Sequence, residues 1–185
     1  MRVSQAEMDK GHQRIVRGAS RLIRKNGIEA TTVAGVMEDA GMTHGGFYRH
    51  FDSKEGLVSA ALDDAFNDVN KLIDDAVLAS GPRQGTEDYF EAYLSERHMN
   101  HPELGCPITA LSMDVARSTA PVKETFSNGF RRTVDRLAQG GDGTPEENRQ
   151  AAIRRLSMVA GAIMIARTLD AKTARSVMKA CKAGR

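Results

Sequence analysis

The 185-residue chain has no tryptophan, and aromatic residues make up only 5% of it. It has two cysteines, Cys106 and Cys181, so the disulfide framework of a small secreted domain is not expected. The longest apolar run, Met158–Ala166, spans nine residues, whereas a membrane-spanning helix needs about 20. The first ten residues lack the apolar core of a signal peptide. These absences predict a cytoplasmic protein that does not insert into a membrane.

β-Strand patterns are also absent, because valine and isoleucine never alternate with polar residues over the length of a strand. Apolar residues recur at helical spacing instead. An apolar fraction of 41% and a charged fraction of 27% are typical of soluble globular proteins. We therefore expect an all-α fold of about nine helices in one or two small domains.

The most informative stretch, Thr31–Leu57, has the pattern of two short helices joined by a tight turn and followed by a long helix. Thr32 can cap the first helix, and Gly41 can provide its left-handed end. Thr43 can cap the second helix, which should run to about Phe51. A helix, a glycine-containing turn and a second helix predict a helix-turn-helix, which places its second helix in a DNA major groove.

The composition of the second helix favours contact with DNA. Phe47 and Phe51 lie four residues apart and therefore share a buried face. Gly45 and Gly46 each cost a helix interior roughly 1 kcal/mol relative to alanine. Their missing side chains allow a DNA backbone or base edge to come close. Arg49 should point away from the two phenylalanines, where it can read a base edge.

The string from Gly45 to Leu57 resembles the DNA-binding domain of TetR-family transcriptional repressors, and the resemblance extends over about residues 10–70. It implies an N-terminal three-helix domain, residues 1–52, and a helical ligand-binding and dimerisation domain, residues 53–185. It further implies a homodimer that binds an inverted-repeat operator in double-stranded DNA and represses transcription until a small-molecule inducer releases it. The matching residues are Gly45, Phe47, Tyr48, His50, Phe51, Ser53, Lys54, Glu55 and Leu57.

Charge supports a nucleic-acid partner for the N-terminal part. Residues 1–50 contain eight Lys or Arg and five Asp or Glu, whereas the remaining 135 residues contain eighteen and nineteen. The resemblance implies that Tyr48, His50 and Lys54 hold the DNA backbone, and hydroxyls at helix N-termini can add phosphate contacts. The candidate DNA-binding residues are Thr32, Thr43, His44, Gly45, Tyr48, Arg49, His50 and Lys54.

The C-terminal part should contain a subunit interface. The segment Leu156–Leu169 is apolar nearly all round, so one side should face the chain's own core and the other a second subunit. We expect the helices over residues 145–169 and 172–183 to pair with their two-fold mates. The candidate dimerisation residues are Val159, Ala162, Ile163, Ala166 and Met178.

The other helix boundaries follow from turn signals. The first helix should run from about Glu7 to Asn26, and the long helix should end near residue 79, before a loop over Ser80–Gly85. Helices are then expected from Thr86 to about Asn100, over Leu104–Arg117, and from residue 121 to about residue 138.

A ligand pocket in the C-terminal part is plausible, because methionines and aromatic residues suit an adaptable apolar site. The candidate lining residues are Phe90, Tyr93, Cys106, Met113, Phe126, Phe130 and Met158. Cys106 precedes a proline at a helix start, so one alternative is a repressor that senses oxidants or electrophiles through this thiol; a buried, inert cysteine is the other interpretation.

No enzymatic motif is recognisable. His98, His101, Glu103 and Cys106 do not have the spacing of a zinc site, so no metal is expected. Paired catalytic carboxylates, a nucleophile elbow and a phosphate-binding loop are absent, so we expect neither an enzyme nor a cofactor. A helical enzyme or binding module that retains a relic helix-turn-helix is the alternative from another class.

Overall fold

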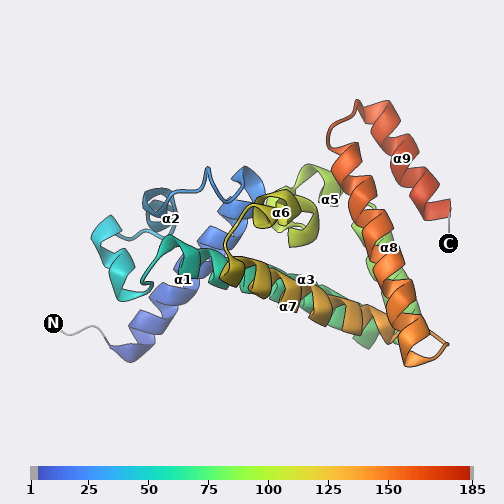
Figure 1. The fold of residues 1–185 in the computed structure, drawn as a ribbon, viewed down its shortest axis with the longest axis horizontal. Helices are drawn as coiled ribbons and strands as arrows, with labels where there is room; N and C mark the ends of the chain where they lie inside the picture. Colours follow the sequence, from blue (N-terminus) through green and yellow to red (C-terminus); the bar gives the residue numbers. More distant parts are fainter. Residues whose placement is uncertain (1–3, 184–185) are drawn as a thin grey trace.

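The computed structural model describes residues 4–183, and every regular element in that range is helical, which confirms the all-α expectation. The molecule is elongated, with α1, α2 and η1 at one end and α8 and α9 at the other (Figure 1). The elements are α1 (Gln5–Asn26), α2 (Val33–Asp39), η1 (His44–Arg49), α3 (Lys54–Ser80), α4 (Pro82–Tyr93), α5 (Glu96–Asn100), η2 (Pro102–Leu104), α6 (Pro107–Ala116), α7 (Ala120–Ala138), α8 (Pro145–Ala166) and α9 (Ala171–Ala183).

The head, which we define as α1, α2 and η1, begins with the elements that the sequence predicts. The Thr32 hydroxyl accepts a 3.1 Å hydrogen bond from the backbone N–H of Gly35 and so caps α2. Gly27 and Gly41 follow α1 and α2 with φ angles of 88° and 68°, which other residues rarely adopt. The buried side chains that these elements share are Ile15, Ala19, Ile23, Val36, Met37, Ala40, Phe47 and Phe51.

The second helix of the motif differs from the prediction. It is a 3₁₀ helix over His44–Arg49 and not an α-helix that reaches Phe51. Thr43 occupies its N-cap position but makes no capping hydrogen bond with its side chain. Two adjacent glycines weaken the helical preference, and the segment is held by packing instead. Phe47 is only 1% exposed, and its ring stacks on that of Phe51 at 5.8 Å.

The long helix α3 connects the head to the body, which we define as α4 to α9. Ser53 caps it through a 3.1 Å hydrogen bond from Gly56 N–H to the serine hydroxyl. Its N-terminal half packs into the head's apolar cluster through residues such as Leu57 and Leu62, and its C-terminal half packs into the body's cluster through Val69 and Ile73. The division at residues 52 and 53 stays a prediction.

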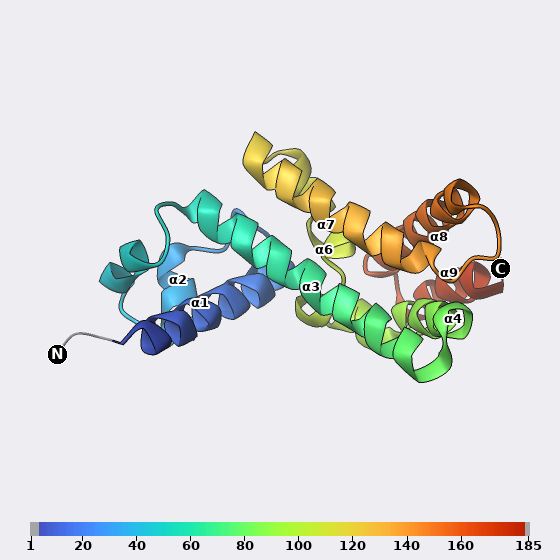
Figure 2. The ribbon, with the colours of Figure 1, turned by 90° about the horizontal axis from the view of Figure 1, so that it is seen from below.

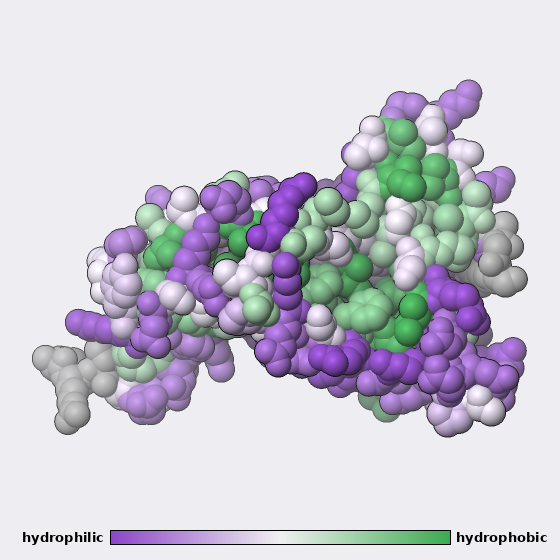
Figure 3. Space-filling model, viewed as in Figure 1, coloured by the Kyte–Doolittle hydropathy of each residue, from purple (hydrophilic) through white to green (hydrophobic). Residues whose placement is uncertain are grey.

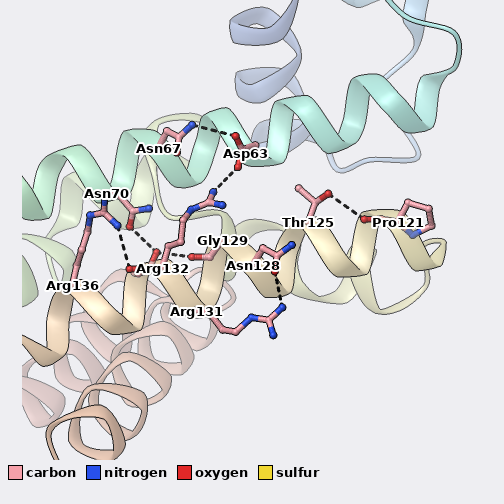
Figure 4. A network of polar contacts seen from close by, with 11 residues as sticks. Asp63, Asn67, Asn70, Pro121, Thr125, Asn128, Gly129, Arg131, Arg132 and Arg136 are labelled. Carbon is pink, nitrogen blue, oxygen red and sulfur yellow. Dashed lines mark hydrogen bonds and ion pairs between the residues drawn. The ribbon is translucent and has the colours of Figure 1, made fainter. Parts of the chain in front are cut away.

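Helix α7 runs along α3 and packs closely against it (Figure 2). At Gly129 the two helices approach so closely that a Cβ atom would lie 2.1 Å from the Phe66 ring. Polar groups line the same contact: the Thr133 hydroxyl donates to Asn70 Oδ1 at 2.9 Å, and Arg132 pairs with Asp63 (Figure 4). These contacts join the body to the helix that leaves the head.

Prolines shorten one predicted loop and interrupt one predicted helix. The loop expected over Ser80–Gly85 is reduced to Gly81, because Pro82 already begins α4 and proline is favoured in the first helical turn. The helix expected over Leu104–Arg117 is interrupted for the same reason. The 3₁₀ helix η2 ends at Leu104, where the predicted helix should have begun, and Pro107 begins α6.

The helix predicted from Thr86 to about Asn100 is also broken. It ends at Tyr93, because the backbone of Leu94 leaves the helical region with φ −85° and ψ 46°. Ser95 then caps the short helix α5 by accepting a 3.2 Å hydrogen bond from a backbone N–H. The break turns the chain, and residues 95–106 fold back beside α3 and α4.

Helices α8 and α9 form the far end of the body. α8 ends at Ala166, three residues before the predicted Leu169. Apolar side chains gather at the surface of this end of the molecule (Figure 3). Ile165 of α8 is 53% exposed. Across residues 4–183, no helix has the length and apolar character to cross a membrane.

Candidate nucleic-acid interface and body cavity

The recognition segment η1 presents Gly45, Tyr48 and Arg49 to the outside while Phe47 fills the core. Tyr48 is 69% exposed, which is unusual for a tyrosine that packs edge-on against Phe47. A Cβ atom added at Gly45 would meet no atom within 4 Å. The glycine therefore fills no packing requirement within the chain, and its surface is free for close approach by another molecule.

Two of the predicted DNA-binding residues also bind their own chain. The Thr32 hydroxyl caps α2, and Lys54 Nζ donates a 3.2 Å hydrogen bond to the Glu29 carbonyl. Thr43 and His44 are exposed at the start of η1. Both of Thr32 and Lys54 keep exposed surface, so the internal bonds orient these groups without burying them.

His50 lies between η1 and α1. Its ring is 5.9 Å from the ring of His12, and a Cβ at Gly11 would be 3.4 Å from it. Partial burial lowers the pKa of His50, and the charges of His12 and Arg49 lower it further. His12 also stacks on Phe51 at 4.7 Å. These contacts fix the orientation of η1 relative to α1.

A second candidate site is a cavity of about 410 Å³ in the body. It lies between α3, α4 and residues 95–106, and it includes two of the predicted lining residues, Tyr93 and Cys106. The other lining residues were not predicted from the sequence, although Tyr89 and Tyr93 share one face of α4 at helical spacing. The lining residues are Val69, Leu72, Ala76, Asp88, Tyr89, Ala92, Tyr93, Ser95, Arg97, His98, His101, Leu104, Gly105 and Cys106.

The other five predicted lining residues lie elsewhere. Phe90 packs into the body core with the Arg155 guanidinium 4.1 Å above its ring. Phe126 contacts Phe66 edge-on at 5.2 Å, in the α3–α7 contact. Met113 and Met158 are exposed, at 56% and 36%. Phe130, the fifth of these residues, lies on α7 and packs against the body core.

Three of the lining residues are buried and carry polar groups: Tyr89, Tyr93 and Cys106, which we call the inner end of the cavity. The hydroxyls of Tyr89 and Tyr93 are fully covered and have no nitrogen or oxygen partner among residues 4–183, and the Tyr93 hydroxyl lies against the Cys106 thiol. Burial raises the pKa of both hydroxyls well above the usual value, and the Cys106 thiol raises them further. Burial also raises the pKa of Cys106, while the Tyr93 hydroxyl lowers it. All three groups are therefore neutral at physiological pH.

His98 connects the cavity walls. Its Nδ1–H donates to the Tyr93 carbonyl at 2.8 Å, and its Nε2 accepts from the Cys106 N–H at 3.0 Å. Burial lowers the pKa of His98 to about 4, so the ring is neutral at pH 7 with this one tautomer. Gly105 leaves room for the ring, because a Cβ there would lie 2.6 Å from it.

The head reaches this wall through Arg24, a charged residue of α1 that is buried. Arg24 Nη1 donates to the Gly105 carbonyl at 3.0 Å, and Nη2 donates to the Ser20 hydroxyl at 3.1 Å and to Asp68 at 3.2 Å. A buried charge needs such partners. One side chain of α1 thus joins α3 and the cavity wall.

A second contact lies beside it. The Asp114 carboxylate of α6 accepts a 2.8 Å hydrogen bond from the Ile28 N–H, just after α1 ends. The head is therefore attached to the body through α3, through these two polar contacts at the C-terminal end of α1, and through Leu111 and Val115 of α6, which belong to the same apolar cluster as the head.

The predicted dimerisation residues lie inside the chain. Their side chains are at most 5% exposed and belong to the body's own core; they are Val159, Ala162, Ile163, Ala166 and Met178. Their part in pairing stays a prediction. The outward-facing apolar residues of this end are Met158, Ile165 and Leu169.

Known proteins resemble both parts. Residues 15–61 match the family described as bacterial regulatory proteins, tetR family. An uncharacterised HTH-type transcriptional regulator of Mycobacterium tuberculosis is 28% identical over 169 residues, 86% of each chain. The HTH-type transcriptional repressor KstR2 of Rhodococcus jostii is 37% identical over 59 residues, 30% of this chain and 29% of that one. A TetR transcriptional regulator from Legionella pneumophila shares the fold, with a TM-score of 0.76 over 99% of this chain and 98% of that one, at 18% identity.

Proposed function

Because the chain belongs to the TetR family of bacterial regulatory proteins and is a helix-turn-helix transcriptional regulator, we propose that it is a repressor that binds an inverted-repeat operator as a homodimer and leaves it when a small molecule binds the body. The observation that carries the proposal is the exposed face of η1, where an unconstrained glycine lies beside an exposed tyrosine and arginine.

The DNA contacts divide by type. Arg49 is exposed and has no ion-pair partner among residues 4–183, so its guanidinium is free to read a base edge. Tyr48 and Lys54 suit phosphate contacts, as do Thr43 and His44 at the start of η1. A cleft between α1 and η1 has three basic residues and one acidic residue, Glu7, in its lining, and the basic residues extend this surface along the backbone: Lys10, Arg14 and Arg49.

Pairing is proposed through the outer face of α8. Met158 and Ile165 lie seven residues apart on α8, so they share one helical face, and Leu169 follows in the turn after the helix. They are 36%, 53% and 38% exposed in the single chain. Ile165→Asp should yield monomers in sedimentation, whereas the equally drastic Leu78→Asp, at an 87% exposed position on α3, should leave dimers. Dimers in both variants contradict this interface.

The release step uses the contact between cavity and head. A ligand that binds one arrangement of the walls better than another shifts the protein toward that arrangement. Any displacement of Gly105 acts on Arg24 and hence on α1, which also supports η1 through His12. Two heads that rotate in this way no longer fit adjacent major grooves, whose centres are about 34–36 Å apart for one helical turn.

A second candidate function is release by oxidants or electrophiles at Cys106. The supporting observation is that this thiol lines the cavity beside the Tyr93 hydroxyl, which can donate to a thiolate. Burial raises its pKa and opposes reaction. If the thiol is the sensor, an alkylating agent should release DNA from the wild type and not from Cys106→Ser. Equal responses assign Cys106 to packing.

The proposed DNA-binding role is tested by selecting genomic fragments with the purified protein. The wild type should enrich a few fragments that share an inverted repeat. Arg49→Ala should relax the preference at one symmetric base pair, at a cost of about 1–3 kcal/mol per half-site. Lys54→Ala should weaken binding to all fragments and flatten the salt dependence by about one phosphate contact per subunit.

The opposite results are equally clear. An enzyme or binding module with a relic head would select no fragment. If both variants leave affinity, salt slope and base preference unchanged, η1 does not read DNA.

A further inference from the structure

We propose that the body cavity binds an uncharged, mostly apolar molecule whose carbonyl or similar acceptor oxygen takes hydrogen bonds from Tyr89 and Tyr93. The inference rests on the proposed release function, because it names the chemistry of the molecule that would act there. It depends on three properties of the cavity: the apolar walls, the buried tyrosine hydroxyls at the inner end, and the placement of charge.

The walls and the opening are apolar. Val69, Ala76 and Ala92 contribute small or branched aliphatic side chains from α3 and α4. Leu72 and Leu104 are 57% and 54% exposed, although large aliphatic side chains gain from burial. A volume of about 410 Å³ is within the usual range for small-molecule sites. The cavity thus favours a compact ring system.

The inner end requires an acceptor. The Tyr89 hydroxyl is buried without a hydrogen-bond partner, and the Tyr93 hydroxyl has only the Cys106 sulfur, a weak acceptor, beside it. A buried donor that lacks a good acceptor is costly. Because burial keeps both hydroxyls protonated, each presents an O–H donor. A ligand oxygen with two lone pairs can accept from both at once. His98 cannot serve either tyrosine, because both of its ring nitrogens are bound to backbone groups.

The charged residues near the cavity are either exposed lining residues or already hydrogen-bonded within the protein. Asp88, Arg97 and His101 line the cavity on exposed or half-exposed positions. Arg167 is not among the lining residues, and its guanidinium donates to the carbonyls of His98, Met99 and Thr109 at 2.9–3.3 Å. A ligand carboxylate at the inner end would lose its hydration for two neutral hydroxyls, and an ammonium would find no carboxylate there.

The test uses four probes of similar size: 1-tetralone, tetralin, 1-naphthoate and 1-naphthylmethylammonium. Tetralone and tetralin differ only in the ketone oxygen. Binding to the purified protein without DNA is measured by calorimetry. Wild type should bind tetralone about threefold to tenfold more tightly per hydroxyl contact than tetralin, and both more tightly than the two ions.

The variants assign the oxygen contact. Tyr89→Phe and Tyr93→Phe should each reduce the tetralone-to-tetralin affinity ratio, and the double variant should bring it to about one, while tetralin affinity stays unchanged. Tyr48→Phe, outside the cavity, should leave the ratio unaltered. The proposal is overturned if no probe binds, if the ratio is one in wild type or survives the double variant, or if an ion binds most tightly.

The release function is judged separately. If tetralone binds with the expected ratio but does not release the selected operator, the ligand chemistry stands and the release mechanism fails. If an ion binds most tightly and releases the operator, the release mechanism stands and the proposed ligand chemistry fails.

Discussion

Replacing Arg24 with methionine tests the link between head and cavity. Methionine keeps the length and much of the volume of the side chain but removes every donor. The Arg24 side chain is only 2% exposed, and its loss removes the bonds to Gly105, Ser20 and Asp68. The Gly105 carbonyl then has no other partner among the described residues, and Gly105 itself is buried.

The partners decide the size of the effect. A buried carbonyl left without a partner costs about 1–3 kcal/mol. Asp68 adds about 0–1 kcal/mol, since its side chain is 60% exposed and water can replace the arginine. Ser20 is also held by the Asp64 side chain. The removed cost of burying the guanidinium offsets part of the loss. We expect a net destabilisation of about 1–3 kcal/mol.

The assay is urea unfolding at fixed protein concentration, together with amide hydrogen exchange. Exchange should rise in residues 105–109 and at the C-terminal end of α1. Arg21→Met is the matched control, because Arg21 lies one turn away but its ion pair with Asp39 is exposed on both sides. It should cost less than about 1 kcal/mol.

Two results would refute the reasoning: an Arg24→Met cost no larger than that of Arg21→Met, or unchanged exchange on both sides of the contact. A ligand that releases the operator from wild type should also lose most of its effect on the Arg24→Met protein, because the route through Gly105 is cut.

Three further predictions concern single positions. Gly45→Ala should change the free energy of unfolding by no more than about 1 kcal/mol, because the added Cβ contacts no other atom. The same variant should weaken operator binding at least tenfold in gel shifts. Unchanged binding would mean that DNA does not approach this residue. Gly129→Ala should destabilise the protein by about 1–3 kcal/mol in urea, because overlap with Phe66 outweighs the gain in helix propensity. The control Gly161→Ala, where a Cβ is unobstructed, should be neutral or stabilising. A larger loss of stability in Gly161→Ala than in Gly129→Ala would contradict the packing. Burial lowers the pKa of His98 to about 4, so the unfolded chain gains the proton first as the pH drops. The free energy of unfolding should therefore fall between about pH 6.5 and pH 4, by up to about 3 kcal/mol. His98→Gln should flatten this pH dependence, and an unaltered profile would exclude His98 as its source.

The head was predictable because its signals are local. The Thr32 cap, the glycine after α2 and the four-residue spacing of Phe47 and Phe51 each act within a few residues, and the structure contains all three. The helix type of η1 was not predictable from the same residues. Spacing indicates which side chains are buried, but the choice between α and 3₁₀ depends on packing against the rest of the head.

The body was less predictable because its decisive contacts are distant in sequence. Arg24 donates hydrogen bonds to Asp68 and Gly105, which lie 44 and 81 positions further along the chain. The sequence around Arg24 does not indicate these partners, so local spacing alone favours an exposed arginine. Leu94 carries no glycine or proline signal, yet the helix break there builds the cavity wall. Only Tyr93 and Cys106 of the predicted lining reach the cavity, since a methionine or aromatic residue fits a core as well as a pocket.

The continuity of α3 limits how such regulators can be recombined. A chimaera that joins this head to a foreign body after Asp52 would remove Leu57, Val58, Ala61 and Leu62, which belong to the head's own apolar cluster. The grafted head would then expose the core that those side chains cover. A join in the middle of α3, between Leu62 and Val69, keeps the α3 residues of each cluster together, and the foreign body must then replace Leu111, Val115 and Val122, which also belong to the head's cluster. Modular exchange of DNA specificity therefore has to cut through a helix rather than through a loop.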